Sequence, residues 1–206
     1  MYSASSRPAS RFHRHAFYLR TGYDVGKKIW SRYRQGNIDH LYLLAGYGNH
    51  MLEWTGGKEI MPYRHPTFSM MASGYYWKVG YHYNFYDNWG DMHNEITLGV
   101  RYGHANFSYE LRDIRIDYPP PYEGTYLNPG PLYFPHLRAW WLELATAVRA
   151  ELFHHFYLDL MIAGKWMPRI PQAANMTAVY VPGFYQTNIS HFGFGLGYGI
   201  SYRFGF

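Results

Sequence analysis

The sequence predicts an all-β protein: a transmembrane, antiparallel, up-and-down β-barrel of about eight strands. Three observations support this prediction. Residues 191–206 alternate between large apolar residues and glycine, other segments repeat the same two-residue period, and long proline-rich connections alternate with short turns. Aromatic residues make up 21% of the 206 residues, yet no stretch holds the ~18–20 consecutive apolar residues that a membrane helix needs.

The closing segment, HFGFGLGYGISYRFGF, shows the two-residue period most clearly. Successive side chains of a strand point to opposite faces, so the even-numbered residues form one large apolar face and the odd-numbered residues, mostly glycine, form the other. Glycine does not solubilise a face that meets water. It suits the inner wall of a narrow barrel, where side chains from the far wall need space, while the apolar face contacts lipid.

The end of this strand also resembles a signal found in many bacterial outer-membrane barrels. That signal is a strand of alternating aromatic residues with Phe last, which the barrel-insertion machinery recognises. The residues that carry the resemblance are Tyr198, Tyr202, Phe204 and Phe206. The resemblance implies the insertion machinery as a partner during biogenesis.

Further strands are predicted from the same alternation. The clear segments lie at 75–85, 95–102, 140–152 and 156–166, and a less regular pair lies at 16–30 and 39–49. A helix over 140–152 is the alternative, because Leu, Ala, Glu and Arg favour helices. Helical spacing would place Glu143 and Glu151 on one poorly buried stripe, so a strand is preferred.

The connections are predicted to differ between the two ends of the barrel. The long connections span about 50–67, 110–137 and 168–188, and they hold nearly all the prolines. They alternate with short turns at 87–91 and 153–155. In outer-membrane barrels the short turns are periplasmic and the long loops are extracellular, and we expect that arrangement here.

An even number of strands is expected when both termini are periplasmic. Because seven segments alternate, the eighth strand is expected within residues 1–36, by division of 16–35 near YDVGKK. Residues 16–206 then form one barrel domain, and residues 1–15 form a basic tail that is either solvated or in contact with phosphates. MYSASSRPAS lacks the apolar region of a secretory signal, so either the protein stays inside the cell or the chain is processed.

Four ordered blocks of the chain carry a family resemblance. They are YYWKVGYHYNFYDNW, ITLGVRYGHANFSYE, AWWLELATAVRAELFHHFYL, and YVPGF followed by the terminal strand. Together they resemble a family of small Bacteroidota outer-membrane β-barrel proteins of unassigned function, from about residue 68 to 206. The resemblance implies the bacterial outer membrane as the location and suggests membership in a larger assembly. It carries no catalytic residues.

Alternation assigns twelve polar residues to the lumen. They are Arg20, Asp24, Lys78, His82, Glu95, Arg101, Glu143, Arg149, Glu151, Asp159, Lys165 and Arg203. Six are basic, five are acidic and one is histidine, and an unpaired charge in so narrow a lumen is costly. We therefore expect ion pairs across the barrel, so that the lumen is filled by side chains whose charges neutralise one another. A channel is not expected, because about eight strands enclose little more than their own side chains.

The sequence predicts no catalytic residues, no cofactor and no metal site. The histidines are attributed to the tail, the turns and the surface, and no nucleophile motif or metal-spaced set such as H-E-x-x-H is present. An outer-membrane barrel enzyme acting on lipid or peptide, with a lumen or rim histidine as its base, is the alternative. A soluble nucleic-acid-binding β-protein is a third possibility, and no nucleic-acid partner is expected.

The segment YPPPYEGTYLNPGPLYFPHL is too stiff and apolar for an ordinary solvated loop. We expect it either to bind protein or to fold over its own barrel mouth. The candidate protein contacts are Tyr118, Tyr122, Tyr126, Tyr133 and Phe134. The predicted function is that of a non-enzymatic structural or accessory subunit of a larger envelope complex, such as insertion, secretion or uptake machinery. Its predicted partners are other outer-membrane proteins and outer-membrane lipid, including lipopolysaccharide.

Overall fold

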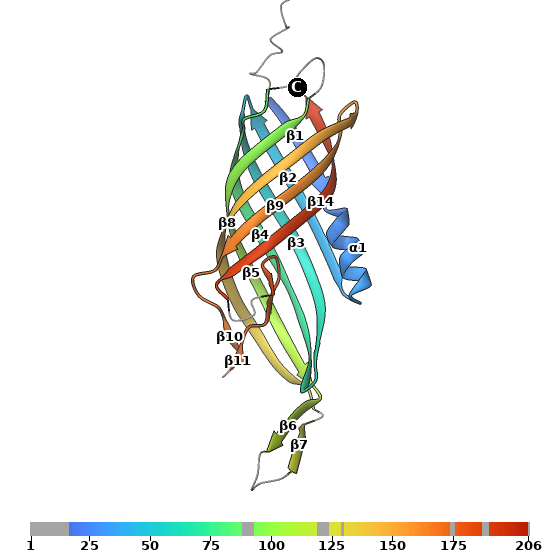
Figure 1. Cartoon of the computed structure of the whole chain (residues 1–206), viewed down its shortest axis with the longest axis vertical. Coiled ribbons are helices and arrows are strands. Elements are labelled where there is room, and N and C mark those ends of the chain that lie inside the picture. The colour runs from blue at the N-terminus through green and yellow to red at the C-terminus, as the bar shows by residue number, and fades with distance from the viewer. Residues whose placement is uncertain are drawn as a thin grey trace, which may run out of the picture.

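The computed structural model describes residues 17–87, 93–118, 124–128, 130–173, 176–186 and 190–205. Eight antiparallel strands close into one barrel, in the order β1-β14-β9-β8-β5-β4-β3-β2 (Figure 1). Their bounds are β1 Phe17–Tyr23, β2 Asn37–Tyr47, β3 His50–His65, β4 Phe68–Asn84, β5 Glu95–Arg112, β8 Leu132–Phe153, β9 Phe156–Trp166 and β14 Phe192–Gly205. The predicted all-β barrel of eight antiparallel strands is confirmed.

The two ends of the barrel differ. At one end, here called the turn end, β2 joins β3, β4 joins β5 and β8 joins β9, and both β1 and β14 have their terminal residues there. The opposite end is called the loop end. It carries the hairpin of β6 (Ile114–Tyr118) and β7 (Gly124–Asn128), and the short strands β10 (Gln172–Ala173), β11 (Met176–Thr177), β12 (Tyr180–Val181) and β13 (Tyr185–Gln186). The helix α1 (Val25–Tyr33), which connects β1 to β2, lies against the side of the barrel wall (Figure 1). Figure 1 shows the β6–β7 hairpin projecting beyond the barrel.

In the turn-end half of the barrel, alternation places apolar side chains outside and charged side chains inside. On β5, Leu98 and Val100 point outward and are exposed, whereas Glu95 and Arg101 point inward and are buried. The glycine face of β14 points inward and its apolar face points outward, as the sequence predicts. Within the described part of the chain, no helix has the length and apolar character needed to cross a membrane.

The polarity of both faces reverses in the loop-end half of the longer strands. Farther along β5 the outward side chains are polar, and the inward ones, including Phe107 and Tyr109, join an apolar core. The matching inward residues of β4 and β8 are apolar as well, for example Tyr76 and Trp141. The strand lengths allow this second core, because β8 has 22 residues and β1 has only 7.

Two of the segment predictions are wrong. Residues 50–67 are not a long loop, because β3 occupies residues 50–65 and pairs with both β2 and β4. The eighth strand is therefore β3, and residues 25–33 form the helix α1 in place of a second N-terminal strand. The alternation of β3 is hard to recognise because its inward face mixes polar residues with apolar ones, in the order Met51, Glu53, Thr55, Glu59 and Met61.

The other two predicted long connections lie at the loop end. Strands β5 and β8 extend into the predicted loop 110–137, as far as Arg112 and from Leu132. The hairpin β6–β7 occupies the middle of that segment. Most of 168–188 is irregular, with two-residue strands only.

Candidate functional site

The first candidate site is a cluster of charges around Glu95 in the turn-end half of the lumen. The guanidinium of Arg20 donates to both oxygens of the Glu95 carboxylate, at 2.6 and 3.0 Å. The hydroxyl of Tyr18 donates to the same carboxylate at 3.1 Å, and Arg149 lies 3.6 Å from it. The Arg20 guanidinium also sits 4.1 Å from the centre of the Tyr157 ring. Because these residues come from β1, β5, β8 and β9, the cluster links strands across the lumen.

A second cluster lies farther toward the loop end and contains two carboxylates. Lys78 donates to Glu143 at 2.7 Å, and Arg101 contacts Glu143 while donating to Glu53 at 3.1 Å. The Nε2 atom of His82 lies 2.8 Å from Glu53. All five side chains are at most 4% exposed. A charge removed from this cluster would leave an opposite charge buried and without its partner.

The structure places all twelve predicted lumen residues toward the interior. Ten are buried: Arg20, Asp24, Lys78, His82, Glu95, Arg101, Glu143, Arg149, Asp159 and Lys165. Glu151 and Arg203 are partly buried near the turn end, where Arg203 lies 4.0 Å from the centre of the Tyr18 ring. Asp24 differs from the others because it caps α1 and does not belong to a strand.

Sequence analysis missed several buried polar residues. Glu53 and Glu59 lie in the segment taken for a loop, and Lys27 lies in the helix that was not foreseen. His40 was also missed, although it alternates with Leu41 on a predicted strand. Adding Lys27 to the six basic groups and Glu53 and Glu59 to the five acidic groups gives seven of each. The interior is thus balanced in charge when its histidines are neutral.

The space between these side chains is small. A cavity of about 30 Å³ is lined by His40, Tyr42, Glu53 and Asp159 among other residues, which is room for about one or two water molecules. The hydroxyl of Tyr42 donates to Asp159 beside it. Such a cavity admits water but no lipid or peptide substrate. Among the described residues, no group of three His, Asp or Glu side chains is arranged to hold a metal ion.

Part of the 167–191 connection folds back into the loop end, and we call residues 178–186 the loop plug. Val181 and Phe184 are fully buried, and the ring of Phe184 packs edge-on against Trp141 at 5.8 Å. The Glu59 carboxylate accepts from the Tyr180 hydroxyl at 2.8 Å and from the backbone N–H of residue 183 at 3.0 Å. The plug therefore packs into the same apolar core as the inward residues of the barrel strands and fills the loop end.

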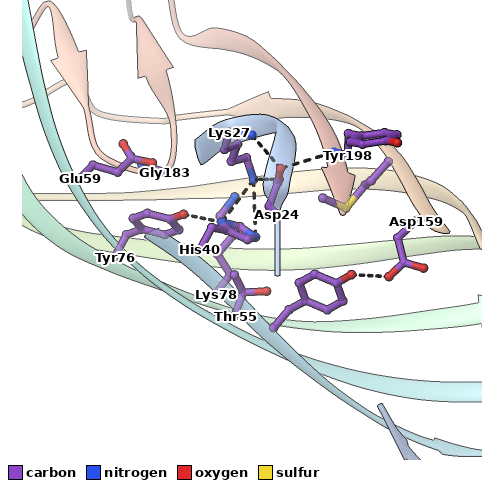
Figure 2. Close-up of polar contacts among 12 residues, drawn as sticks. Asp24, Lys27, His40, Thr55, Glu59, Tyr76, Lys78, Asp159, Gly183 and Tyr198 are labelled. Carbon is purple, nitrogen blue, oxygen red and sulfur yellow. Dashed lines mark hydrogen bonds and ion pairs between the residues drawn. The ribbon is translucent and has the colours of Figure 1, made fainter. Parts of the chain in front are cut away.

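The backbone of the loop plug is held on its other side by Lys165, whose Nζ donates to the carbonyl of Gly183 at 2.8 Å. Gly183 has φ +77°, a conformation that favours glycine, and a Cβ there would lie 2.6 Å from the Tyr76 ring. Figure 2 shows Gly183 beside Glu59. Burial raises the pKa of Tyr180 well above its usual range, so its hydroxyl remains the donor to Glu59.

The helix α1 stands in a lateral gap of the barrel wall. Strand β1 stops at Tyr23, opposite Ile200, so the part of β14 from 192 to 199 pairs with β9 on one side and with no described strand on the other. Asp24 spans this junction: its carboxylate accepts from the backbone N–H of Lys27 at 2.9 Å and of Tyr198 at 3.4 Å (Figure 2). One side chain thus begins the helix and satisfies part of the unpaired edge.

Lys27 connects the helix to the interior of the barrel. Its Nζ lies 2.8 Å from Asp24 and 3.2 Å from the Nδ1 atom of His40, and His40 contacts the Tyr76 hydroxyl (Figure 2). The helix therefore buries a charged residue toward the lumen. Its neighbour Lys28 binds Asp39 on the outer surface at 2.6 Å.

The remaining predicted site residues lie at the two ends. Of the C-terminal signal, Tyr198 and Phe204 are exposed on the outer face, and Tyr202 packs edge-on against Phe204 at 4.7 Å; Phe206 lies outside the described residues. Of the loop contacts, Tyr133 is 63% exposed, whereas Phe134 packs against the loop-end core. Tyr122 and the side chains of Tyr118 and Tyr126 lie outside the described part. The role of each group stays a prediction.

The chain belongs to the family described as a domain of unknown function (DUF6048), whose family model matches residues 7–206. No protein with curated annotation matches the sequence. Three solved structures are similar in fold. Neisserial surface protein A is 10% identical, with a TM-score of 0.48 over 93% of this chain and 97% of its own. The N-terminal β-barrel domain of Pseudomonas aeruginosa OprF is 9% identical, with a TM-score of 0.42 over 92% and 98%. A major outer membrane protein from Thermus thermophilus is 14% identical, with a TM-score of 0.49 over 93% and 100%.

Proposed function

We propose that this DUF6048 protein is a bacterial outer-membrane barrel with a sealed interior, and that it serves as a non-enzymatic structural or accessory subunit of a larger envelope complex. The observation that carries the proposal is the distribution of polarity in the turn-end half. Apolar side chains cover its outside, and paired charges fill its inside. The resemblance of four sequence blocks to Bacteroidota barrels supports a source in that phylum.

The outer surface supports a location in a membrane. Large apolar side chains such as Phe194 and Leu196, 63% and 65% exposed, continue around the wall through Leu144 and Val100. A contiguous apolar surface well beyond a few hundred Å² is rare on soluble monomers, whereas acyl chains solvate it without cost. The 14 residues of β14 exceed the ~9–11 that a tilted spanning strand needs.

The orientation follows from the positions of the termini and the connections. In outer-membrane barrels the short turns face the periplasm. The turn end, with the beginning of β1 and the end of β14, is therefore the periplasmic end, and the loop end faces outward. This places the loop plug and the β6–β7 hairpin on the extracellular side.

The filled lumen favours a function carried out at the outer surface of the protein over one carried out inside the barrel. The small cavity beside Glu53 has room for water alone. Glu53 lies 2.8 Å from His82, and this pair most resembles a general base with its orienting group. The β6–β7 hairpin instead projects away from the barrel (Figure 1), and Tyr133 at its base is exposed. The sequence between β6 and β7 is rich in proline, and proline limits the entropy that a segment loses when it docks on a partner.

Quantitative co-purification from detergent-solubilised membranes tests this proposal. Residues 114–128 are replaced by a Gly/Ser linker of equal length, which leaves β5 and β8 intact. The matched control carries a Gly/Ser insertion at the 66–67 turn, which lies at the same end of the barrel. We expect the variant to lose outer-membrane protein partners that the control keeps. Partners unchanged in both would contradict the proposal, and hydrolytic activity of the partner-free barrel that is lost in His82→Gln would favour an enzyme.

A further inference from the structure

A groove of about 710 Å³ runs between α1 and the unpaired part of β14. Trp30 and Arg34 of the helix form one wall, and Phe194 and Leu196 of β14 form the other. Tyr185 of the loop plug closes the inner side. The volume falls within the ~300–1,000 Å³ of pockets that bind small ligands.

The groove opens on the apolar outer surface of the barrel. Leu160 and Ile162 of β9 also line it, and these side chains point outward like Phe194 and Leu196. They belong to the same surface that is proposed to contact acyl chains. An apolar chain in the surrounding membrane therefore reaches the groove without crossing water.

The helix α1 is oriented in the opposite way to a helix on a soluble protein. It buries Lys27 and Ser31 against the barrel, while Ile29, Trp30 and Tyr33 are exposed. Exposed aromatic and aliphatic residues among lysines and arginines are typical of helices that lie in the interfacial region of a membrane. This orientation places the groove at the height where lipid headgroups meet acyl chains.

The charge of the groove favours an anionic headgroup. Arg34 is exposed at the end of α1, with its guanidinium 5.7 Å from the centre of the Trp30 ring. No Asp or Glu lines the groove, and neither Arg34 nor Arg32 forms an ion pair with a carboxylate of the described residues. A guanidinium that is not already paired matches the two oxygens of a phosphate.

From these observations we infer that the groove binds one acyl chain of an anionic phospholipid, with the lipid phosphate on Arg34. The inference rests on the proposed membrane location and adds a specific site to it. The occupant inserts its chain between Trp30 and Leu196, in the position where β1 would continue if the barrel wall were complete. The lipid thereby completes the wall at its one interrupted seam among the described strands.

Photo-crosslinking in nanodiscs tests the inference on the full chain. The probes are phosphatidylglycerol and phosphatidylcholine with the same diazirine-bearing acyl chain, each diluted in unlabelled phosphatidylcholine. Labelling is measured on peptides that cover 24–34 and 190–198, and on the peptide that covers 95–102 as an internal reference. We expect the groove peptides to be labelled several-fold more by phosphatidylglycerol than by phosphatidylcholine, and the reference peptide to be labelled equally by both.

Two variants and their controls identify the contacts. Leu196→Trp fills the groove and should abolish the enrichment, whereas Leu144→Trp, at an equally exposed site on β8, should keep it. Arg34→Glu should remove the preference for phosphatidylglycerol, whereas Arg138→Glu, on the outer face of β8, should not. Equal labelling of the groove by both lipids, or enrichment that survives Leu196→Trp, overturns the inference. If the reference peptide is labelled but the groove is not, the groove proposal alone fails; if neither is labelled, the membrane location fails too.

Discussion

Replacing Glu143 by Gln removes one negative charge from the lumen with little change in shape. Glu143 lies between Lys78, at 2.7 Å, and Arg101, and it also accepts from the indole N–H of Trp141 at 2.7 Å. The amide oxygen of Gln can keep one of these hydrogen bonds. Arg101 retains Glu53 as a partner, whereas Lys78 has no second carboxylate among its described contacts.

The expected loss of stability follows from the buried cation, Lys78, that loses its partner. Breaking a buried ion pair by removing one partner costs about 3–5 kcal/mol. Glu143 also lies 3.8 Å from a third cation, Lys165, which keeps the Gly183 carbonyl as a partner, and Arg101 keeps Glu53. We therefore expect the free energy of unfolding to fall by about 3 kcal/mol, the lower end of that range. The control is Glu110→Gln on the outer face of β5, where the Glu110–Arg112 pair is largely exposed. A surface pair contributes about 0–1 kcal/mol, so this variant should be nearly neutral.

Urea titration of the barrel in lipid vesicles, followed by tryptophan fluorescence, measures both changes. The double variant Glu143→Gln with Lys78→Met should regain part of the lost stability, because it removes the unpaired cation as well. A Glu143→Gln protein that unfolds within about 0.5 kcal/mol of the unmodified protein would refute the reasoning. It would mean that water or rearranged side chains satisfy Lys78, and that its charge does not depend on Glu143 as a partner.

Three further predictions concern the loop end. Gly183→Val should release the loop plug, because the backbone has a positive φ there and the new side chain would collide with the Tyr76 ring. Hydrogen exchange of the amides of 178–186 should then accelerate. The control Gly164→Val, whose side chain meets open space, should leave the exchange of 178–186 unchanged. Asp24→Ala should weaken α1 by about 1–2 kcal/mol, seen as faster exchange of its amides, and unchanged exchange would argue against the capping role. Tyr133→Ala should leave the unfolding midpoint unchanged but lower the amount of partner protein that co-purifies. Phe134→Ala should destabilise the fold by about 2 kcal/mol, because Phe134 packs against the loop-end core. Equal effects of the two variants on stability would contradict their different placement.

The strands that could be predicted are those whose faces keep one polarity throughout. In 140–152 and in 192–204 every outward residue except Thr146 is apolar, so a two-residue period is easily recognised. Strand β3 has the same period, but each of its faces mixes polar and apolar residues: Met51, Glu53 and Glu59 are buried on one face, and Leu52, Lys58 and Ile60 lie on the other. A search for one apolar face therefore fails on it.

The helix α1 was missed for a related reason. Its apolar residues, Ile29, Trp30 and Tyr33, follow helical spacing, and Asp24 is a good N-cap residue. These features were present in the sequence, but an even strand count favoured another strand at this position. A helix that turns its apolar side away from the barrel has no pattern that points to a core.

The composition of the lumen could be predicted, but its pairing could not. Alternation alone assigns Arg20 and Glu95 to the inside, although they are far apart in the sequence. Which carboxylate faces which cation depends on the stagger of the strands and on the tilt of the barrel, and neither is encoded in a single strand. The loop plug and the groove depend on contacts between segments that meet only after the barrel has closed.

The change of polarity along β5 between Tyr102 and His104 has a mechanical consequence. Sliding the molecule outward would expose Leu98 and Val100 to water, and sliding it inward would carry His104 and Asn106 into hydrocarbon. Both displacements are unfavourable, so the side chains on the outer face fix how deeply the barrel sits in the membrane. In the proposed membrane location, the β6–β7 hairpin is thereby kept at a constant height above the bilayer, and a neighbouring protein that binds it would meet it at that height in every copy.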